Sequence, residues 1–317
     1  MKRFEIGEND AGQRLDRYLQ KILGRAGRDL LFKLLRKKTF KVNGARITSG
    51  ERFLEPGDVV EVFLSDESFE KLKTAPELLE ARPLPMPIVY EDDHLLVVDK
   101  PVGMLTHPTK EEYKDTAATH VLHYLKSCVT PTFRPAPISR LDQNTSGLLV
   151  FAKDYATLKR WNQAMRERSI EKYYLAVVHG RIGQDRGSIR GMIEKDESMN
   201  RSTVRSSQSV PSRIPSHGRS HSSPRVAVAR EVHTDYRVLR RFDDFTLVEA
   251  KLITGRSHQI RASFASIGHP LVGDLKYGGR IVSGIRSQLL HCHRLQLGDA
   301  EFVSPSREID TFIGRYR

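Results

Sequence analysis

The chain has 317 residues, of which 38% are hydrophobic and 29% charged, and its formal net charge is +13 at pH 7. No apolar run approaches the roughly 20 residues that span a bilayer, and the polar N-terminus lacks the apolar core of a signal peptide. The two cysteines, Cys128 and Cys292, give no disulfide framework. We therefore expect a cytoplasmic protein without a membrane segment. The positive charge favours a polyanionic partner over a basic but inert surface.

Residues 12–64 have the pattern of a compact module. Apolar side chains at helical spacing predict an amphipathic helix over 15–23. A second helix is expected to begin near Asp29, as its cap, and to bury Leu30, Leu31, Leu34 and Leu35. The sequence then predicts a strand over 40–42, a tight turn at Asn43-Gly44 and a closing strand over 59–64.

This module is strongly basic. From Gln13 to Arg46 there are 11 Lys or Arg against two Asp, a net charge of 11 − 2 = +9. Two short basic helices followed by a small sheet resemble the RNA-binding domain first seen in ribosomal small-subunit protein four. The resemblance implies RNA binding, and the alternative is a structural helix–hairpin with solvated charges. The residues expected to contact RNA are Arg17, Lys21, Arg36, Lys37, Lys38 and Lys41.

We divide the chain into an RNA-binding domain (1–65), a mixed, Pro-rich linker (66–87) and a catalytic domain (88–317). Beyond residue 88, strand-like segments recur with helices between them but without regular alternation, which predicts an α+β domain with a mixed, largely antiparallel sheet. Residues 201–225 hold nine Ser, five Arg and no acidic residue. This composition predicts a mobile surface insertion. It is either a tolerated insertion or an RNA-phosphate contact.

The segment 139–153 carries the strongest chemical signal. Asp142 stands just before a polar turn, an apolar run that reads as a buried strand follows, and Arg140 lies two residues away from the carboxylate. Loops held by rigid strands often carry catalytic groups. Without further context, however, a lone Asp here would be read as a turn former.

The surrounding motif supplies that context. The segment resembles the His-Arg-Leu-Asp-x-x-Thr-Ser-Gly-Leu motif of the RluA-type pseudouridine synthases, with Ser139 in place of the usual His. Residues 172–180 resemble the family strand that aligns Tyr174 with its active-site tyrosine. Residues 254–261 resemble Thr-Gly-Arg-x-His-Gln-Ile-Arg, in which Arg261 best matches the partner of the catalytic aspartate and Arg256 is the alternative. The segments 268–278 and 290–295 and Lys100-Pro101 extend the likeness over about 88–297. Lys100 itself is either a strand-end charge or an RNA contact.

The resemblance implies an isomerase that needs no cofactor and no metal. Asp142 would act as nucleophile or essential base, and Arg261 would keep it ionised. Tyr174 would pack on the uracil, with its hydroxyl near the C5 proton, unless it is an ordinary core tyrosine. The target base must leave its stack, and Arg140 would fill the space. Large-subunit ribosomal RNA is the favoured substrate and transfer RNA the second; nothing demands more than a monomer.

Other chemistries fit less well. His291 and His293 share one face of a strand, but two ligands do not make a zinc site. The stretch from Asp142 to Thr145 half-resembles the signature of aspartyl-phosphate phosphatases, yet Asn144 stands where a second carboxylate is needed. Phosphate-loop glycine patterns are absent. A protein that only binds RNA, such as a ribosome assembly factor, is the alternative from another class, and the presence of all three catalytic candidates argues against it.

Overall fold

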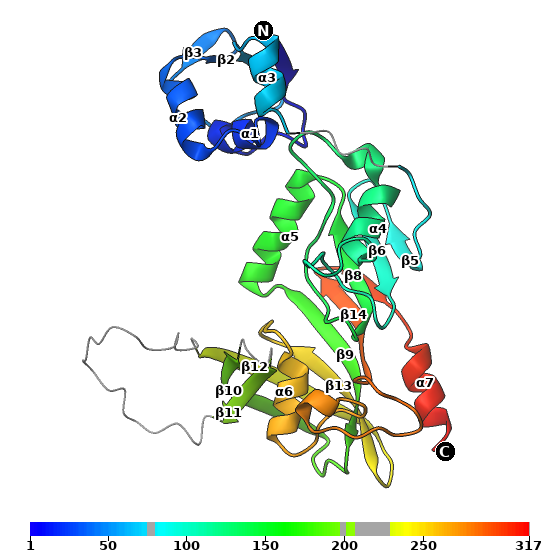
Figure 1. Cartoon of the computed structure of the whole chain (residues 1–317). Coiled ribbons are helices and arrows are strands. Elements are labelled where there is room, and N and C mark those ends of the chain that lie inside the picture. The colour runs from blue at the N-terminus through cyan, green and yellow to red at the C-terminus, as the bar shows by residue number, and fades with distance from the viewer. Residues whose placement is uncertain (75–79, 197–200, 207–228, 317) are drawn as a thin grey trace, which may run out of the picture.

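The computed structural model describes residues 1–74, 80–196, 201–206 and 229–316. Within these ranges no helix has both the length and the apolar character that crossing a membrane requires. The strands form two separate sheets, one of four strands near the N-terminus and one of 11 strands in the rest of the chain. Figure 1 shows the N-terminal elements as a small body at one end of an elongated molecule.

The N-terminal sheet has the strand order β1-β4-β2-β3. Helices α1 and α2 bury their apolar stripes in its core, which includes Leu15, Leu19 and Phe40. The predicted first helix and the strand over 40–42 are confirmed. The elements are β1 (Lys2–Glu5), α1 (Leu15–Ile22), α2 (Arg28–Arg36), β2 (Phe40–Val42), β3 (Ala45–Ile47), β4 (Val59–Val62) and α3 (Asp66–Leu72).

Two predictions for helix α2 were wrong. Asp29 does not cap α2; Gly27 is the cap residue and Asp29 lies in the first turn. Leu31 and Leu35 are buried, but Leu30 is 39% exposed, because only one stripe of the helix faces the core. The expected linker also begins with a helix: Ser65 caps α3, and Phe69 packs into the N-terminal core.

The large sheet has the order β11-β10-β12-β13-β9-β14-β8-β6-β5, with β15 beside β14 and β7 beside β8. Every pairing is antiparallel except that of β14 with β8, so the predicted mixed, largely antiparallel sheet is confirmed. Its strands are β5 (Ile88–Glu91), β6 (Leu95–Lys100), β7 (Ala136–Pro137), β8 (Ser146–Ala152), β9 (Ile170–His179), β10 (Arg186–Asp196), β11 (Arg201–Ser206), β12 (Arg230–Arg241), β13 (Phe245–Leu252), β14 (Leu290–Leu297) and β15 (Ala300–Val303).

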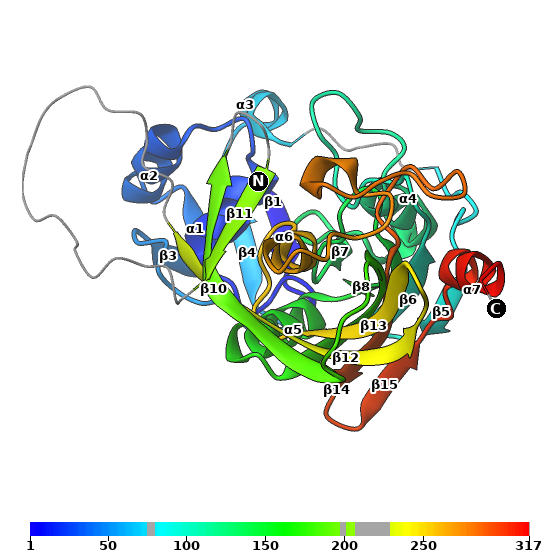
Figure 2. The ribbon, with the colours of Figure 1, turned by 90° about the horizontal axis from the view of Figure 1, so that it is seen from below.

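Helices cover different parts of this sheet (Figures 1 and 2). Helix α5 packs on β8 through the buried Trp161, and α6 packs on β10, β11 and β12. The helices are α4 (Ala117–Tyr124), α5 (Tyr155–Glu167), α6 (Gln259–Ser266) and α7 (Arg307–Gly314), with the short 3₁₀ turns η1 (Lys126–Cys128) and η3 (Leu275–Tyr277).

The predicted mobile insertion begins with a regular strand. Residues 201–206 form β11, which pairs with β10 from Asp196↔Arg201 to Gly191↔Ser206. Backbone hydrogen bonds sustain this pairing, so the Ser- and Arg-rich composition did not reveal it. Of the predicted insertion, 207–225 lie outside the described residues.

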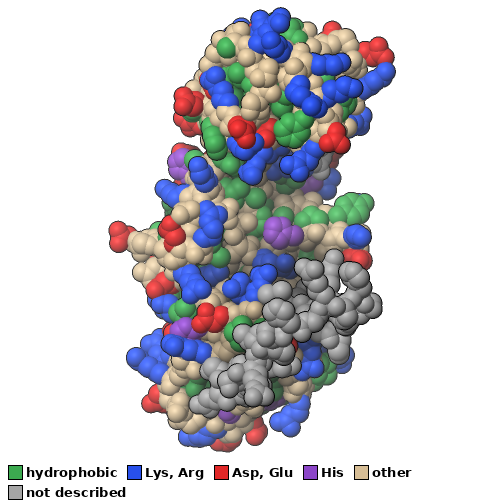
Figure 3. Space-filling view, turned by 90° about the vertical axis from the view of Figure 1, so that its left-hand side faces the viewer, with side chains coloured by type: hydrophobic (Ala, Val, Ile, Leu, Met, Phe, Trp, Pro, Cys, Tyr) green, Lys and Arg blue, Asp and Glu red, His purple; other side chains and the backbone are tan. Residues whose placement is uncertain are grey.

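Polar contacts join the N-terminal body to the large sheet. Asp10 accepts hydrogen bonds from Thr130 and Thr132. The Lys21 ammonium donates to the Thr132 carbonyl at 2.7 Å and to Gln13 at 3.0 Å. Lys21 was predicted to contact RNA, but in the structure its charge is engaged within the protein. Arg17, Arg36, Lys37 and Lys38 are exposed, and Figure 3 shows Lys and Arg side chains over both bodies on one face.

Gly147 is required by the close approach of β8 to β14. Its φ is +107°, and a Cβ there would fall on the backbone of Cys292. We predict that Gly147→Ala lowers the stability of the large domain by roughly 2–3 kcal/mol, because it adds strain and a clash with rigid backbone. Urea unfolding followed by the emission of Trp161, the single tryptophan, measures this.

Gly183→Ala is the matched control, because a Cβ at Gly183 meets nothing within 4 Å. Its stability should stay within ~0.5 kcal/mol of the parent protein. Equal unfolding midpoints for the two variants would contradict the requirement for glycine at position 147.

Candidate active site

Buried polar contacts fix the loop that carries Asp142. The Thr145 amide donates to the Asp142 carbonyl at 3.0 Å, and the Thr106 hydroxyl bonds both the carbonyl and the amide of Leu141. The Lys100 ammonium donates to the carbonyls of Pro101, Met104 and Gln143 at 2.8, 2.9 and 3.1 Å. Burial lowers the pKa of Lys100 to about 8. Lys100 is therefore an internal brace of the loop, which neither of the two sequence-based alternatives anticipated.

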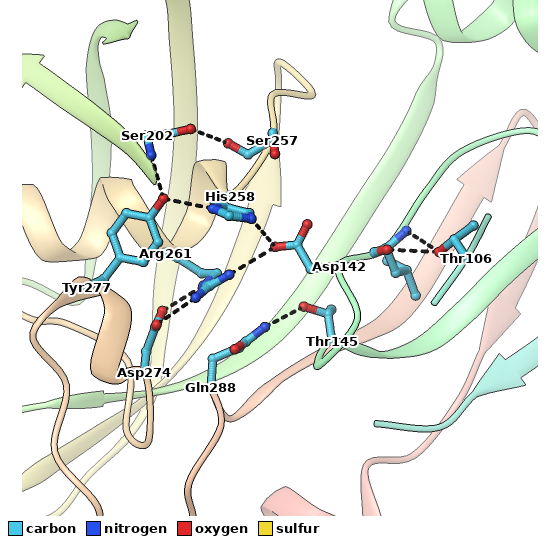
Figure 4. A network of polar contacts seen from close by, with 11 residues as sticks. Thr106, Asp142, Thr145, Ser202, Ser257, His258, Arg261, Asp274, Tyr277 and Gln288 are labelled. Atoms are coloured by element: carbon cyan, nitrogen blue, oxygen red, sulfur yellow. Dashed lines mark hydrogen bonds and ion pairs between the residues drawn. The ribbon is translucent and has the colours of Figure 1, made fainter. Parts of the chain in front are cut away.

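Arg261 is the arginine that contacts Asp142. Its Nε and one terminal nitrogen each donate to Asp274 at 2.7 Å, and the other terminal nitrogen reaches Asp142 Oδ2 at 3.4 Å (Figure 4). Burial alone would lower the pKa of Arg261, but the pairing with Asp274 raises it above its ordinary value. Arg256 lies in the same cavity but has its Nε 3.5 Å from the Glu231 carbonyl, so geometry favours Arg261 over the alternative.

A second chain of contacts approaches Asp142 through His258 (Figure 4). The Ser202 amide donates to the Tyr277 hydroxyl at 2.8 Å, and that hydroxyl lies 2.9 Å from His258 Nδ1. Burial lowers the pKa of His258, so the imidazole is neutral near pH 7. A hydroxyl that donates to Nδ1 leaves the Nε2–H facing Asp142, 3.8 Å away.

The predicted site residues did not include Asp274, His258 or Tyr277. All three lie in segments that carried the family resemblance, 254–261 and 268–278, and this was the available signal. Their roles depend on contacts between segments: η3 and the turn before it face α6. No local pattern specifies such contacts.

Asp142, Tyr174 and Arg261, the three predicted catalytic residues, line one cavity of about 230 Å³. The wall is mixed: polar and charged side chains line it beside the apolar residues Leu141, Met165, Leu252, Ile260 and Leu290. Arg140 is exposed and also lines the cavity, whereas the predicted RNA-binding residues of the N-terminal body do not.

Asp142 also borders a second, more polar hollow of about 360 Å³. Four Lys or Arg side chains line this hollow: Arg140, Arg261, Lys276 and Arg286. Its two carboxylates, Asp142 and Asp274, both face Arg261. The hollow therefore keeps an excess of positive charge, which suits an anionic ligand.

Tyr174 is 6% exposed and projects from β9 into the cavity. Burial raises the pKa of its hydroxyl well above the ordinary value, and the neighbouring Cys292 and Asp142 raise it further. The residue is therefore a neutral phenol at physiological pH. Its ring is available for packing, and its hydroxyl can donate or accept a hydrogen bond without carrying charge.

The two histidines of β14 have partners within the protein. His291 accepts from the Ser146 hydroxyl at 2.9 Å and donates to the Ser304 carbonyl at 3.1 Å, and His293 lies 3.0 Å from Glu249. In the described ranges no group of three or more His, Cys, Asp or Glu side chains could hold a metal ion.

Residues 94–266 match the family described as RNA pseudouridylate synthase, and this chain belongs to that family. It is therefore an RNA pseudouridine synthase, an isomerase that acts on RNA. Among its relatives are "Ribosomal large subunit pseudouridine synthase C" of Vibrio cholerae, 31% identical over 96% of this chain and 90% of the relative, and the uncharacterized RNA pseudouridine synthase YlyB of Bacillus subtilis, 32% identical over 90% and 85%.

Solved structures agree with the fold. "Human RNA Pseudouridylate Synthase Domain Containing 4" superposes with a TM-score of 0.57 at 23% identity, covering 73% of this chain and 92% of that one. "Human RNA Pseudouridylate Synthase Domain Containing 1" gives a TM-score of 0.54 at 25% identity, covering 75% and 89%.

The fork between Asp274 and Arg261 predicts a positioning role for Asp274. We expect Asp274→Asn to lower the single-turnover rate of pseudouridine formation about 100-fold, because the guanidinium loses the partner that orients it. RNA affinity should change little. The exposed Asp243→Asn removes the same charge elsewhere and should retain the parent rate. A normal rate for Asp274→Asn, with unchanged Trp161 emission, would refute this role.

Proposed function

We propose that this enzyme converts specific uridines of large-subunit ribosomal RNA to pseudouridine, with Asp142 as nucleophile or essential base. The observation that carries the proposal is the pairing of Asp142 with Arg261 in a cavity that also holds Tyr174. Asp142 can act as nucleophile or base only while its carboxylate stays ionised beneath bound RNA. An adjacent guanidinium favours the charged form.

The two hollows around Asp142 suggest how the nucleotide lies. The uracil enters the cavity that holds Tyr174 and packs against the ring of that residue. The sugar and its phosphates face the polar hollow, with Arg140, Lys276 and Arg286 as their counter-charges. Arg140 stands between the two hollows, where it can fill the space that the everted base leaves in the RNA stack.

The reaction moves the link between the ribose and the base from N1 to C5. The bond between C1′ and N1 breaks, the base turns, C5 joins C1′, and the C5 hydrogen leaves as a proton. A carboxylate at the junction of base and sugar can act on either of them. Because Tyr174 is held neutral, it contributes its ring and a neutral hydroxyl, and the negative charge in the site comes from Asp142.

We infer that the N-terminal body is an RNA-binding domain like that of ribosomal small-subunit protein four. Arg17, Arg36, Lys37 and Lys38 are exposed on it, and the Lys41 ammonium lies 4.9 Å from the Phe63 ring centre. The relatives whose names specify a large-subunit ribosomal substrate match 87–96% of this chain. We place the enzyme in the cytoplasm, acting as a monomer.

We predict that Asp142→Asn abolishes activity while leaving the fold intact. The amide keeps the shape of the side chain but cannot act as nucleophile or base, so we expect a loss of roughly 10⁴-fold or more. Tritium release from RNA labelled at uracil C5 measures it. The test uses total RNA from a strain lacking the gene, so that its target is unmodified. Substantial activity in Asp142→Asn would overturn the catalytic assignment.

The target class is tested on the same RNA. Pseudouridines that vanish on deletion and return with the enzyme should map to large-subunit ribosomal RNA. Their appearance in transfer RNA alone would refute the proposed substrate.

We predict that reversing the charges of Arg36, Lys37 and Lys38 to Glu weakens binding to all RNAs. Binding with fewer phosphate contacts releases fewer counterions. The negative slope of log affinity against log salt should therefore become shallower by about 2. Filter binding between low and moderate salt measures this. Lys71→Glu, on α3 of the same body, is the control and should change affinity little. Unchanged affinity of the triple variant at low salt would exclude RNA binding through these residues.

A further inference from the structure

Lys172 places a cation in the cavity that holds Asp142. It lies on β9 two residues before Tyr174, so both side chains leave the strand on the same side. Both line the cavity. A Cβ at Gly255 would lie 3.8 Å from the Lys172 Nζ, so the ammonium rests against the backbone turn that precedes α6.

The ammonium of Lys172 has little to neutralise it. In the described part of the chain its one polar contact is the thioether of Met165 at 3.7 Å, and no carboxylate lies within ion-pair distance. Lys251, on the neighbouring strand, shows the usual arrangement: its ammonium is 2.6 Å from Glu171. Burial lowers the pKa of Lys172, as expected where a charge loses water without gaining a partner.

Such an arrangement is costly for folding alone. Lys172 is half-buried, and a cation that loses water without gaining a counter-ion lowers stability; a methionine of similar length would fill the same space at less cost. The cation becomes favourable when an anionic group enters the cavity. The partial burial of the ammonium strengthens that attraction, because it lowers the local dielectric below that of water.

We propose that Lys172 is a further catalytic residue, whose ammonium donates a hydrogen bond to a carbonyl oxygen of the everted uracil and stabilises the negative charge that the base acquires during isomerisation. This inference rests on the proposed function of the site. In this proposal Asp142 starts the reaction, and Lys172 acts on the base.

Both routes open to Asp142 require such a group. If the carboxylate acts at the sugar, the C1′–N1 bond breaks and its electron pair leaves with the base, so N1, O2 and O4 share the charge. If the carboxylate adds to C6, the charge moves to O4 as an enolate. In either case the C1′–N1 bond is broken and C5 joins C1′. The bond that Asp142 made to the sugar or to C6 then breaks and returns the carboxylate, the C5 hydrogen departs as a proton and N1 ends protonated. Lys172 keeps its own proton throughout.

The test is Lys172→Met, compared with Lys159→Met, which removes an exposed lysine on α5. We expect Lys172→Met to slow single-turnover tritium release from the deletion-strain RNA by 10²–10³-fold, the usual loss for one preorganised donor. RNA affinity should stay within about twofold, since the charge is needed mainly as the reaction proceeds. Thermal stability should not fall, since a buried charge is removed.

Lys172→Arg and the pH profile separate this role from a structural one. The ammonium is charged below its lowered pKa, so the parent rate should fall as pH rises through that pKa. The arginine variant, which stays charged, should recover part of the rate and lose this alkaline decline. If the role of Lys172 were purely structural, the arginine variant would neither recover the rate through its charge nor lose the alkaline decline.

Parent-like tritium release by Lys172→Met, or a loss of RNA affinity as large as its loss of rate, would overturn the proposal for Lys172 alone. Absence of tritium release by the parent enzyme would instead overturn the proposed function of the site.

Discussion

The arrangement of the site depends on one guanidinium shared by two carboxylates. Arg261 comes from α6, which packs on β10, β11 and β12, whereas Asp142 precedes β8 in the other half of the sheet. Asp274 holds the guanidinium with two bonds of 2.7 Å, and Asp142 receives one contact of 3.4 Å. The short fork fixes the direction of the arginine. The longer contact leaves the Asp142 carboxylate near a positive charge without locking it, so it remains able to engage a substrate.

Other buried polar groups hold the loop that carries Asp142 and so maintain its contact with Arg261. Lys100 is fully buried, yet three backbone carbonyls surround its ammonium, and one of them belongs to the residue after Asp142. Thr106 holds the residue before it. These contacts are complete within the protein. Lys172 differs because its ammonium has only a thioether nearby. Lys100 is fully buried with all its donors satisfied, whereas Lys172 is half-buried and unsatisfied; this contrast separates a structural brace from a group suited to a ligand.

The sequence predicted best what depends on short spacing. The strand over 40–42 has the predicted bounds, because apolar alternation and turn residues are local signals. Asp142, Tyr174 and Arg261 were found through motifs, and the structure places them in one cavity. Helix α3 was missed because a seven-residue helix that buries one phenylalanine has almost no periodic pattern. Strand β11 was missed because backbone pairing with β10 and the burial of Val204 hold it, and neither gives its Ser- and Arg-rich sequence a clear apolar alternation. The Arg261–Asp274 fork and the Lys100 brace join segments 13 and 43 residues apart, and spacing alone does not specify such geometry.

The polarity of the two hollows restricts how RNA can bind. The cavity that holds Tyr174 suits a uracil, because its apolar side chains can pack on the base and its polar side chains can meet the carbonyl oxygens. The more polar hollow lined by Arg140, Lys276 and Arg286 suits the phosphates. In the binding mode proposed above, the base lies toward Tyr174 and Lys172 and the phosphates toward these three cations. The glycosidic bond then lies near Asp142, the acidic residue that borders both hollows. On this reading, the shape of the site selects the bond to be broken, and sequence selectivity is left to contacts farther along the RNA.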